Sequence, residues 1–188
     1  MRLLKISIFK TTVLMFLLFP GAGTAQHFNV QTGLYDYLDN VARDFYLFSP
    51  TALAGADIWG HQALSLNASA GFGFRSFRYN ERKHHLYTLP VFITMNYDAG
   101  NRDSKYYPTF GAGFSLLGKA DKNRSLEKTH YSFTYGYHFR GSFNYRTGGG
   151  TVLFIDILYN LLVYPAMEEI NLMGVMPSVG LKFPLSSQ

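Results

Sequence analysis

Hydrophobic and polar residues alternate with a period of two along most of the chain after residue 26. This pattern places one set of side chains on each face of an extended strand. The clearest run lies between residues 130 and 146. Its first face is apolar and consists of Tyr131, Phe133, Tyr135, Tyr137, Phe139, Phe143 and Tyr145. Its second face is mainly polar and consists of His130, Ser132, Thr134, Gly136, His138, Arg140, Ser142, Asn144 and Arg146. The run predicts one long β-strand.

The same alternation recurs along the chain and predicts an all-β fold of eight strands. We expect them at about 28–38, 50–60, 62–79, 85–99, 105–120, 129–146, 150–165 and 171–185. The first two are the least regular, since the apolar face of the second consists largely of Ala52, Ala54 and Ala56. In the third strand, Phe77 changes parity relative to Phe74, which predicts a β-bulge after Phe74.

The predicted connections are of two kinds, which follow the strands in turn. Short turns rich in Gly, Asn or Asp come after the second, fourth and sixth strands, at 60–61, 99–105 and 146–150. Longer or more charged connections come after the odd-numbered strands, at 39–49, 80–84, 121–129 and 165–171. This order is typical of an antiparallel up-and-down β-barrel with two different ends.

The chemistry of the two faces separates a membrane barrel from a soluble, lipocalin-like one. One face holds Phe, Tyr, Leu, Ile, Val and Met with almost no charge, and the other is rich in Gly, Ser, Thr and Asn. A soluble barrel would need a charged exterior, whereas a transmembrane barrel needs an apolar exterior and a polar lumen. Tyrosines also gather near the predicted strand ends, as in an interfacial girdle, at Tyr97, Tyr106, Tyr107, Tyr131, Tyr145 and Tyr164. The pattern therefore favours a transmembrane β-barrel.

Residues 1–25 have the pattern of a cleaved signal peptide. Three basic residues, Arg2, Lys5 and Lys10, precede a short apolar stretch that ends at Pro20. That stretch is much shorter than the about 20 residues that a membrane-spanning helix needs. Small residues before Gln26 complete a cleavage site, so we expect export and a barrel domain over 26–188.

Composition and charge exclude several classes of function. The chain is 47% hydrophobic and 17% aromatic, which excludes a disordered protein. It has 17 basic and 12 acidic residues, and three of the basic ones lie in the leader, so 14 remain against 12 and we expect no nucleic-acid binding. The chain has no cysteine, which excludes disulfides, thiol catalysis, Cys-ligated metals and a lipid anchor on an N-terminal cysteine.

The last strand carries a recognisable motif, Ser178-x-Gly180-x-x-Phe183-x-Leu185. It is similar to the C-terminal signal that the barrel-insertion machinery recognises, although many such proteins end on the aromatic residue and this chain continues past it. The whole of 26–188 resembles the small OmpA/OmpX-like eight-stranded outer-membrane barrels of Gram-negative bacteria. The strands with Leu89-Pro90-Val91 and Tyr107-Pro108-x-x-Gly111-Ala112-Gly113 resemble sequences of the outer membrane protein beta-barrel domain. The resemblance implies a monomer inserted among outer-membrane lipids, and it implies no single activity.

Charged residues at lumen parity are the first candidates for a functional site. They are Arg75, His138, Arg140, Asp156 and Lys182. We expect them to form an internal network of ion pairs and hydrogen bonds that fills the barrel, because charges in a low-dielectric lumen require partners. A catalytic use of His138 with Asp156 is the alternative, since lipid A deacylases and palmitoyltransferases are small barrels. The His-x-Ser-Asn motif of the deacylases is absent, so we expect no catalytic residue.

Basic residues near the predicted longer connections are the second candidates. Arg82, Lys83, Lys122, Arg124 and Lys128, with Lys119 nearby, are expected to contact the phosphates of lipopolysaccharide.

Three other motifs have structural explanations. His84 and His85 are adjacent on a strand and point to opposite faces, so we expect no metal site and no cofactor. Residues 39–45 predict a short helix that is either a lid or an ordinary loop. Glycines at lumen parity in Gly71-x-Gly73 and Gly111-x-Gly113 allow a narrow barrel to close.

The sequence thus predicts an integral outer-membrane β-barrel with a packed polar lumen and a structural or surface-interaction role. A narrow porin-like channel and a lipid A-modifying enzyme remain the alternatives.

Overall fold

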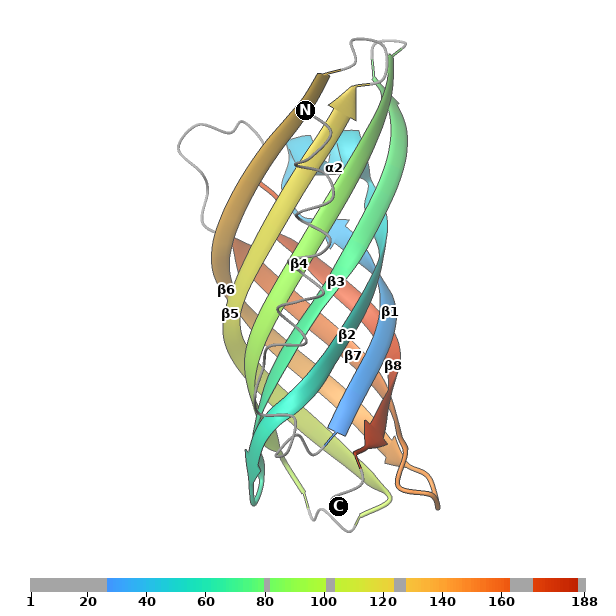
Figure 1. The fold of residues 1–188 in the computed structure, drawn as a ribbon, viewed down its shortest axis with the longest axis vertical. Coiled ribbons are helices and arrows are strands. Elements are labelled where there is room, and N and C mark those ends of the chain that lie inside the picture. The colour runs from blue at the N-terminus through green and yellow to red at the C-terminus, as the bar shows by residue number, and fades with distance from the viewer. Residues whose placement is uncertain (1–26, 80–81, 101–103, 124–127, 163–170, 186–188) are drawn as a thin grey trace, which may run out of the picture.

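The computed structural model describes residues 27–79, 82–100, 104–123, 128–162 and 171–185, which form a closed antiparallel barrel of eight strands (Figure 1). The strands are β1 His27–Tyr37, β2 Phe48–His61, β3 Leu64–Tyr79, β4 Arg82–Asp98, β5 Tyr106–Asn123, β6 Lys128–Arg146, β7 Val152–Leu162 and β8 Gly174–Pro184. A short helix, α2 Asn40–Tyr46, lies between β1 and β2. Each strand pairs with its neighbours in sequence, and β1 pairs with β8 to close the barrel. The predicted eight-stranded up-and-down barrel is confirmed, and the predicted leader lies outside the described residues.

The two ends of the barrel differ. At one end, which we call the turn end, β1 begins and β8 ends, and Gln62 and Ala63 join β2 to β3. The opposite end, which we call the loop end, carries α2. In Figure 1 the turn end is the lower end and α2 lies near the upper end. No helix among the described residues is long and apolar enough to span a membrane.

Four strands extend beyond the others at the loop end. Strands β3 to β6 have 16 to 19 residues, whereas β1, β7 and β8 have 11 each. The pairing of β3 with β2 stops at Gly73, and the pairing of β6 with β7 begins only at Gly136. Figure 1 shows these four strands rising above β1. We call residues 74–79, 82–87, 120–123 and 128–135 the protruding sheet.

Much of two predicted loops belongs to this sheet. Connections are predicted from the sequence at 80–84 and 121–129, but 82–84, 121–123 and 128–129 are strand. Charged residues in these segments suggested loops. They occur in strands because the β3–β4, β4–β5 and β5–β6 pairings continue through these segments, as far as Arg82, Asn123 and Lys128.

The barrel wall separates apolar from polar side chains. Phe139 and Ile155 point outward and are 54% and 62% exposed, whereas His138 and Asp156 on the same strands point inward and are fully buried. The same division holds on β4, β5 and β8. An apolar exterior around a closed sheet is stable in lipid and not in water. The predicted apolar-outside arrangement is therefore confirmed.

Three details of the predicted faces are wrong. Phe77 points inward and packs against the apolar residues inside the barrel, and the β3–β4 register continues through it without a bulge. The register shift lies instead on β2, between Asp57 and Trp59. Tyr107, predicted for the outer girdle, is buried on the lumen face, where its carbonyl oxygen accepts a hydrogen bond from Asn144. Phe77 can point inward because the lumen holds a cluster of buried apolar side chains against which it packs.

Candidate functional site in the lumen

A charged cluster occupies the middle of the lumen and centres on Asp156. Arg140 Nε donates a hydrogen bond to Asp156 Oδ1 at 2.8 Å, and Ser142 Oγ donates to the same oxygen at 2.7 Å. Ser178 Oγ lies 3.5 Å from Asp156 Oδ2. Arg140 Nη2 donates to Gln31 Oε1 at 3.0 Å. These residues come from β6, β7, β8 and β1, so the cluster links the strands on both sides of the barrel closure.

Phe154 packs between the two inward cations next to this cluster. Arg140 Cζ lies 5.5 Å and Lys182 Nζ 5.7 Å from the centroid of the Phe154 ring. The ring lies over Gly180, where an added Cβ would collide with Phe154 Cζ. Gly180 therefore provides the space that the aromatic ring fills. This arrangement allows cation–π contacts to supplement the ion pair.

A layer of uncharged polar groups lies next to the cluster toward the loop end. His138 Nε2 shares a hydrogen bond of 2.8 Å with Thr94 Oγ1, and its ring packs edge-on against Phe92. Ser115 Oγ donates to Asn160 Oδ1 at 2.6 Å, and Asn160 Nδ2 donates to the hydroxyl of Tyr35 at 3.1 Å.

These contacts bear on the histidine that was considered for catalysis. The structure gives His138 a hydroxyl partner and not a carboxylate. Its side chain is fully buried, so His138 does not form the pair with Asp156 that was considered for catalysis.

An apolar cluster fills the lumen at the loop end. Its buried side chains come from six strands or their flanks and from α2, and they are Tyr35, Tyr37, Ala42, Tyr46, Leu53, Leu86, Phe92, Leu117, Leu158, Leu162, Leu172 and Met176. Aromatic contacts connect Tyr37 to Tyr46 at 5.5 Å and Tyr46 to Phe77 at 5.2 Å between ring centroids. We call this set the apolar plug.

Helix α2 is part of the plug, since its residues Ala42 and Tyr46 belong to the buried cluster. Asp39 caps the helix, because its carboxylate accepts a hydrogen bond from the amide of Ala42 at 2.9 Å. Ala42 and Tyr46 are buried against the inward side chains of the strands, whereas Arg43 and Asp44 are exposed. The predicted helix at 39–45 is confirmed in position, since the structure has it at Asn40–Tyr46.

Polar side chains fill the lumen at the turn end. Asn67 Nδ2 donates to Asp57 Oδ1 at 2.9 Å. Asn144 Nδ2 donates to Thr109 Oγ1 at 2.8 Å, and Thr109 Oγ1 donates to Asp98 Oδ1 at 2.7 Å. Together with the charged cluster, the uncharged layer and the apolar plug, these groups lie at successive levels of the lumen within the part of the chain that the structure describes.

The structure brings together part of the predicted network. Arg140 and Asp156 form an ion pair, and Lys182 joins them through Phe154. Arg75 lies apart from them, near the loop end, with its guanidinium 5.0 Å from the ring centroid of Phe48.

Sequence reasoning missed several partners in the lumen. Gln31 reaches the cluster only through the pairing of β1 with β8, which the alternation of a single strand does not reveal. Phe154 was missed because an apolar residue at lumen parity carries no sign of a polar network.

The predicted basic residues lie on or near the protruding sheet. Lys83 and Lys122 are exposed on its outer face, and Arg78, which the sequence analysis did not select, is exposed directly opposite Lys83. The backbones of Arg82 and Lys128 lie in β4 and β6, and Arg124 is outside the described residues. Lys119 is buried on the lumen face and does not belong to this group.

The structure also shows which faces the histidine pair and the C-terminal motif occupy. His84 stacks on Phe77 and its Nδ1 lies 3.3 Å from Asp121 Oδ1, whereas His85 stacks on Phe74 on the opposite face. No group of three His, Asp or Glu side chains within the described ranges could hold a metal ion. In the C-terminal motif, Ser178 and Gly180 face the lumen and the side chains of Phe183 and Leu185 are exposed.

Comparison with solved structures finds this fold in bacterial outer-membrane proteins. Neisserial surface protein A (NspA) is 14% identical, with 87% of this chain and 98% of NspA covered and a TM-score of 0.59. OprG from Pseudomonas aeruginosa is 14% identical, with 85% and 97% covered and a TM-score of 0.57. A major outer membrane protein from Thermus thermophilus is 10% identical, with 86% and 99% covered and a TM-score of 0.60. No protein-family model matches the chain, and no curated protein matches its sequence. The fold is that of a small outer-membrane barrel, as the sequence resemblance implied.

Proposed function

We propose that this chain, a barrel of the outer-membrane type, is a structural or surface-interaction protein with a filled lumen and no catalytic activity. The observation that carries the proposal is that buried polar side chains and the apolar plug follow one another along the described part of the lumen. Eight-stranded barrels have interiors just wide enough for side chains, so a filled lumen leaves no route for solutes. The turn end then faces the periplasm and the loop end faces outward, which is the usual orientation of such barrels.

Recording of single channels in planar bilayers tests the filled lumen. We expect the refolded chain to give no stable conductance steps, because both the charged cluster and the apolar plug would have to open. Stable steps at low voltage would contradict the proposal and favour the narrow channel. Mass spectrometry of lipid A from cells with and without the protein tests the enzyme alternative, and a change in acyl chains would overturn the non-catalytic role.

The protruding sheet supports the surface-interaction role. Its outer face carries the exposed cations Arg78, Lys83 and Lys122, together with exposed aromatic residues such as Tyr131 and Phe133. Arg78 and Lys83 lie directly opposite each other in the β3–β4 register, and Lys122 lies opposite His85 on the neighbouring strand. Like charges in direct opposition repel, so an anion between them stabilises the pair. The phosphates of lipopolysaccharide have the required charge and accept hydrogen bonds from such cations.

A binding measurement tests this contact. We expect the triple variant Arg78→Ser, Lys83→Ser and Lys122→Ser to retain about tenfold less lipopolysaccharide than the native chain after refolding. Arg43→Ser is the matched control, because Arg43 is an exposed cation on α2, outside the protruding sheet. Equal retention by the triple variant and the native chain would remove lipopolysaccharide as the partner of this face.

A further inference from the structure

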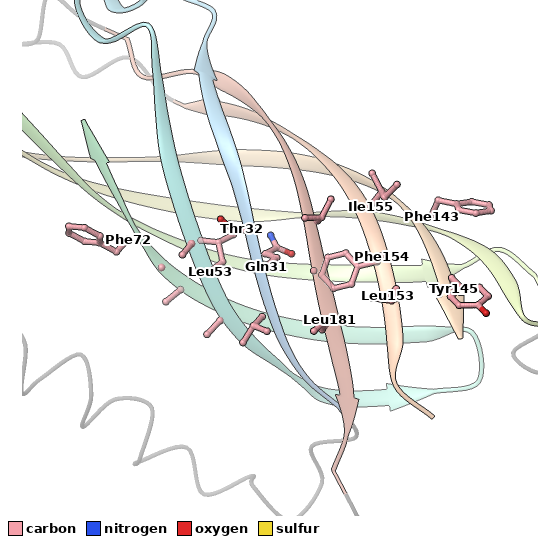
Figure 2. A pocket seen from close by; sticks show the side chains of 17 residues that line it. Gln31, Thr32, Leu53, Phe72, Phe143, Tyr145, Leu153, Phe154, Ile155 and Leu181 are labelled. Atoms are coloured by element: carbon pink, nitrogen blue, oxygen red, sulfur yellow. The ribbon is translucent and has the colours of Figure 1, made fainter. Parts of the chain in front are cut away.

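The outer wall of the barrel carries an apolar groove of about 1070 Å³. It crosses six neighbouring strands, from β3 through β2, β1, β8 and β7 to β6 (Figure 2). The register keeps its lining in one band, since Val30 pairs with both Ala54 and Leu181, and Leu181 pairs with Leu153. Most of the lining residues have outward parity, which places the groove on the lipid-facing surface. Five residues of lumen parity also contribute to its lining: Gln31, Leu53, Gly71, Phe154 and Gly180.

Small side chains make the floor of this groove and large ones its ends. Ala52 and Ala54 on β2 leave the backbone of the wall accessible from outside. Figure 2 shows Phe72 at one end of the band and Phe143 and Tyr145 at the other. The lining is almost wholly apolar. The groove volume slightly exceeds the range of about 300–1,000 Å³ for small-molecule sites, so the groove is large enough for the acyl chains of a lipid.

A cation stands at the end of the groove formed by β6. Lys105 Nζ lies 5.3 Å from the ring centroid of Tyr145, which lines the groove. Lys105 is exposed at the turn end, and its carbonyl oxygen accepts a hydrogen bond from the amide of Arg146 at 2.8 Å. Tyr106 packs against Tyr145 with ring centroids 5.0 Å apart. Aromatic rings next to an exposed lysine are typical of the interface between hydrocarbon and headgroups.

We propose that the groove binds one anionic phospholipid of the leaflet at the turn end. The acyl chains lie along Ala52, Ala54 and Val30, and the headgroup phosphate contacts Lys105. Charge and shape both select this occupant. A zwitterionic lipid fills the apolar part equally well but brings less negative charge to the ammonium, and a second copy of the barrel leaves the lysine without an anion. The proposal depends on the barrel spanning a membrane, and it is independent of whether the lumen conducts.

Native mass spectrometry of the refolded full chain tests the site. The chain is incorporated in mixed vesicles of phosphatidylglycerol and phosphatidylcholine and then released in mild detergent. We expect one phosphatidylglycerol to remain bound, with about tenfold preference over phosphatidylcholine. Lys105→Ser removes the preference and leaves bound lipid of either kind. Because Lys105 is exposed, this variant folds as the native chain does.

Filling the groove tests the apolar half of the proposal. Ala54→Phe places a ring in the floor and is expected to lower lipid retention about tenfold. Ala54→Leu is a smaller change in the same direction, should the phenylalanine impair folding. Ala112→Phe is the matched control, because Ala112 is exposed on the outer face of β5, outside the groove.

Three results would overturn the proposal. The first is equal lipid retention by the Ala54 variants and the Ala112 control. The second is an unchanged preference for phosphatidylglycerol in Lys105→Ser. The third is a dimer mass that Ala54→Phe abolishes, since the groove would then be an interface between two copies. A conducting barrel that still retains the lipid would overturn the proposed function alone.

Discussion

Replacement of Asp156 by leucine probes the charged cluster directly. Asp156 is fully buried, and it accepts hydrogen bonds from Arg140 and Ser142. The Arg140 side chain is only 6% exposed. In Asp156→Leu the guanidinium keeps the hydrogen bond to Gln31 but has no anion within the charged cluster.

The expected cost follows from this burial. Removal of one partner of a buried ion pair destabilises proteins by about 3–5 kcal/mol, because the remaining charge is neither hydrated nor paired. Replacement of both partners by apolar residues is often nearly neutral, since no buried charge remains. We therefore expect Arg140→Met with Asp156→Leu to recover most of the stability that Asp156→Leu loses. The two changes should be strongly non-additive.

Urea unfolding in lipid vesicles measures these differences. Trp59 is the single tryptophan and is exposed on β2, so its fluorescence reports the transfer of the wall from lipid to water. Asp36→Ser is the matched control, because the Arg43–Asp36 pair is exposed at both ends and exposed pairs contribute about 0–1 kcal/mol. A loss below about 1 kcal/mol in Asp156→Leu would refute the reasoning. A double variant no more stable than the single one would refute it as well.

Three further experiments test other contacts of the lumen and of α2. Gly180→Ala should destabilise the barrel by about 1–3 kcal/mol in the same urea assay, because the added methyl group meets the Phe154 ring. Phe154→Leu in the same chain should restore part of this loss. Asp39→Ala should cost about 1 kcal/mol and increase the hydrogen-exchange rate of the Ala42 amide, which loses its capping acceptor; an unchanged rate would contradict the cap. Tyr35→Phe should cost about 1–3 kcal/mol by urea unfolding, since the hydroxyl donates to one buried group and accepts from another; a neutral result would mean that water replaces it.

The fold could be predicted because each strand separates two different environments, the lumen on one face and the exterior of the barrel on the other. On β6, Phe139 faces outward and His138 faces inward, so the period-two pattern in the sequence maps directly onto the barrel. The same rule placed Arg140 and Asp156 on the lumen face. They could be paired in advance because β6 and β7 are consecutive and antiparallel.

The rest of the lumen depends on information that one strand does not contain. The contact of Arg140 with Gln31 is set by how far β1 is displaced along β8 when the barrel closes. Phe77 was assigned a bulge because an apolar residue at lumen parity conflicts with a polar lumen. The structure resolves the conflict with the apolar plug, in which Phe77 contacts Tyr46 of α2. The plug is assembled from distant segments and has no local signature.

Cysteine labelling tests the central claim, an apolar exterior around a filled lumen, most directly. The native chain has no cysteine, so single cysteines can be placed at Ser142 and Ser115, which face inward, and at Phe143 and Phe114, which face outward. In intact membranes, we predict that a water-soluble maleimide labels none of the four. In a second experiment, a fluorophore is attached to each cysteine in denaturant and the protein is then refolded into lipid. Quenchers carried by the lipid should reduce its fluorescence only at positions 143 and 114. Aqueous labelling at 142 or 115 would contradict the filled lumen, and aqueous labelling at 143 or 114 would contradict the membrane-spanning wall.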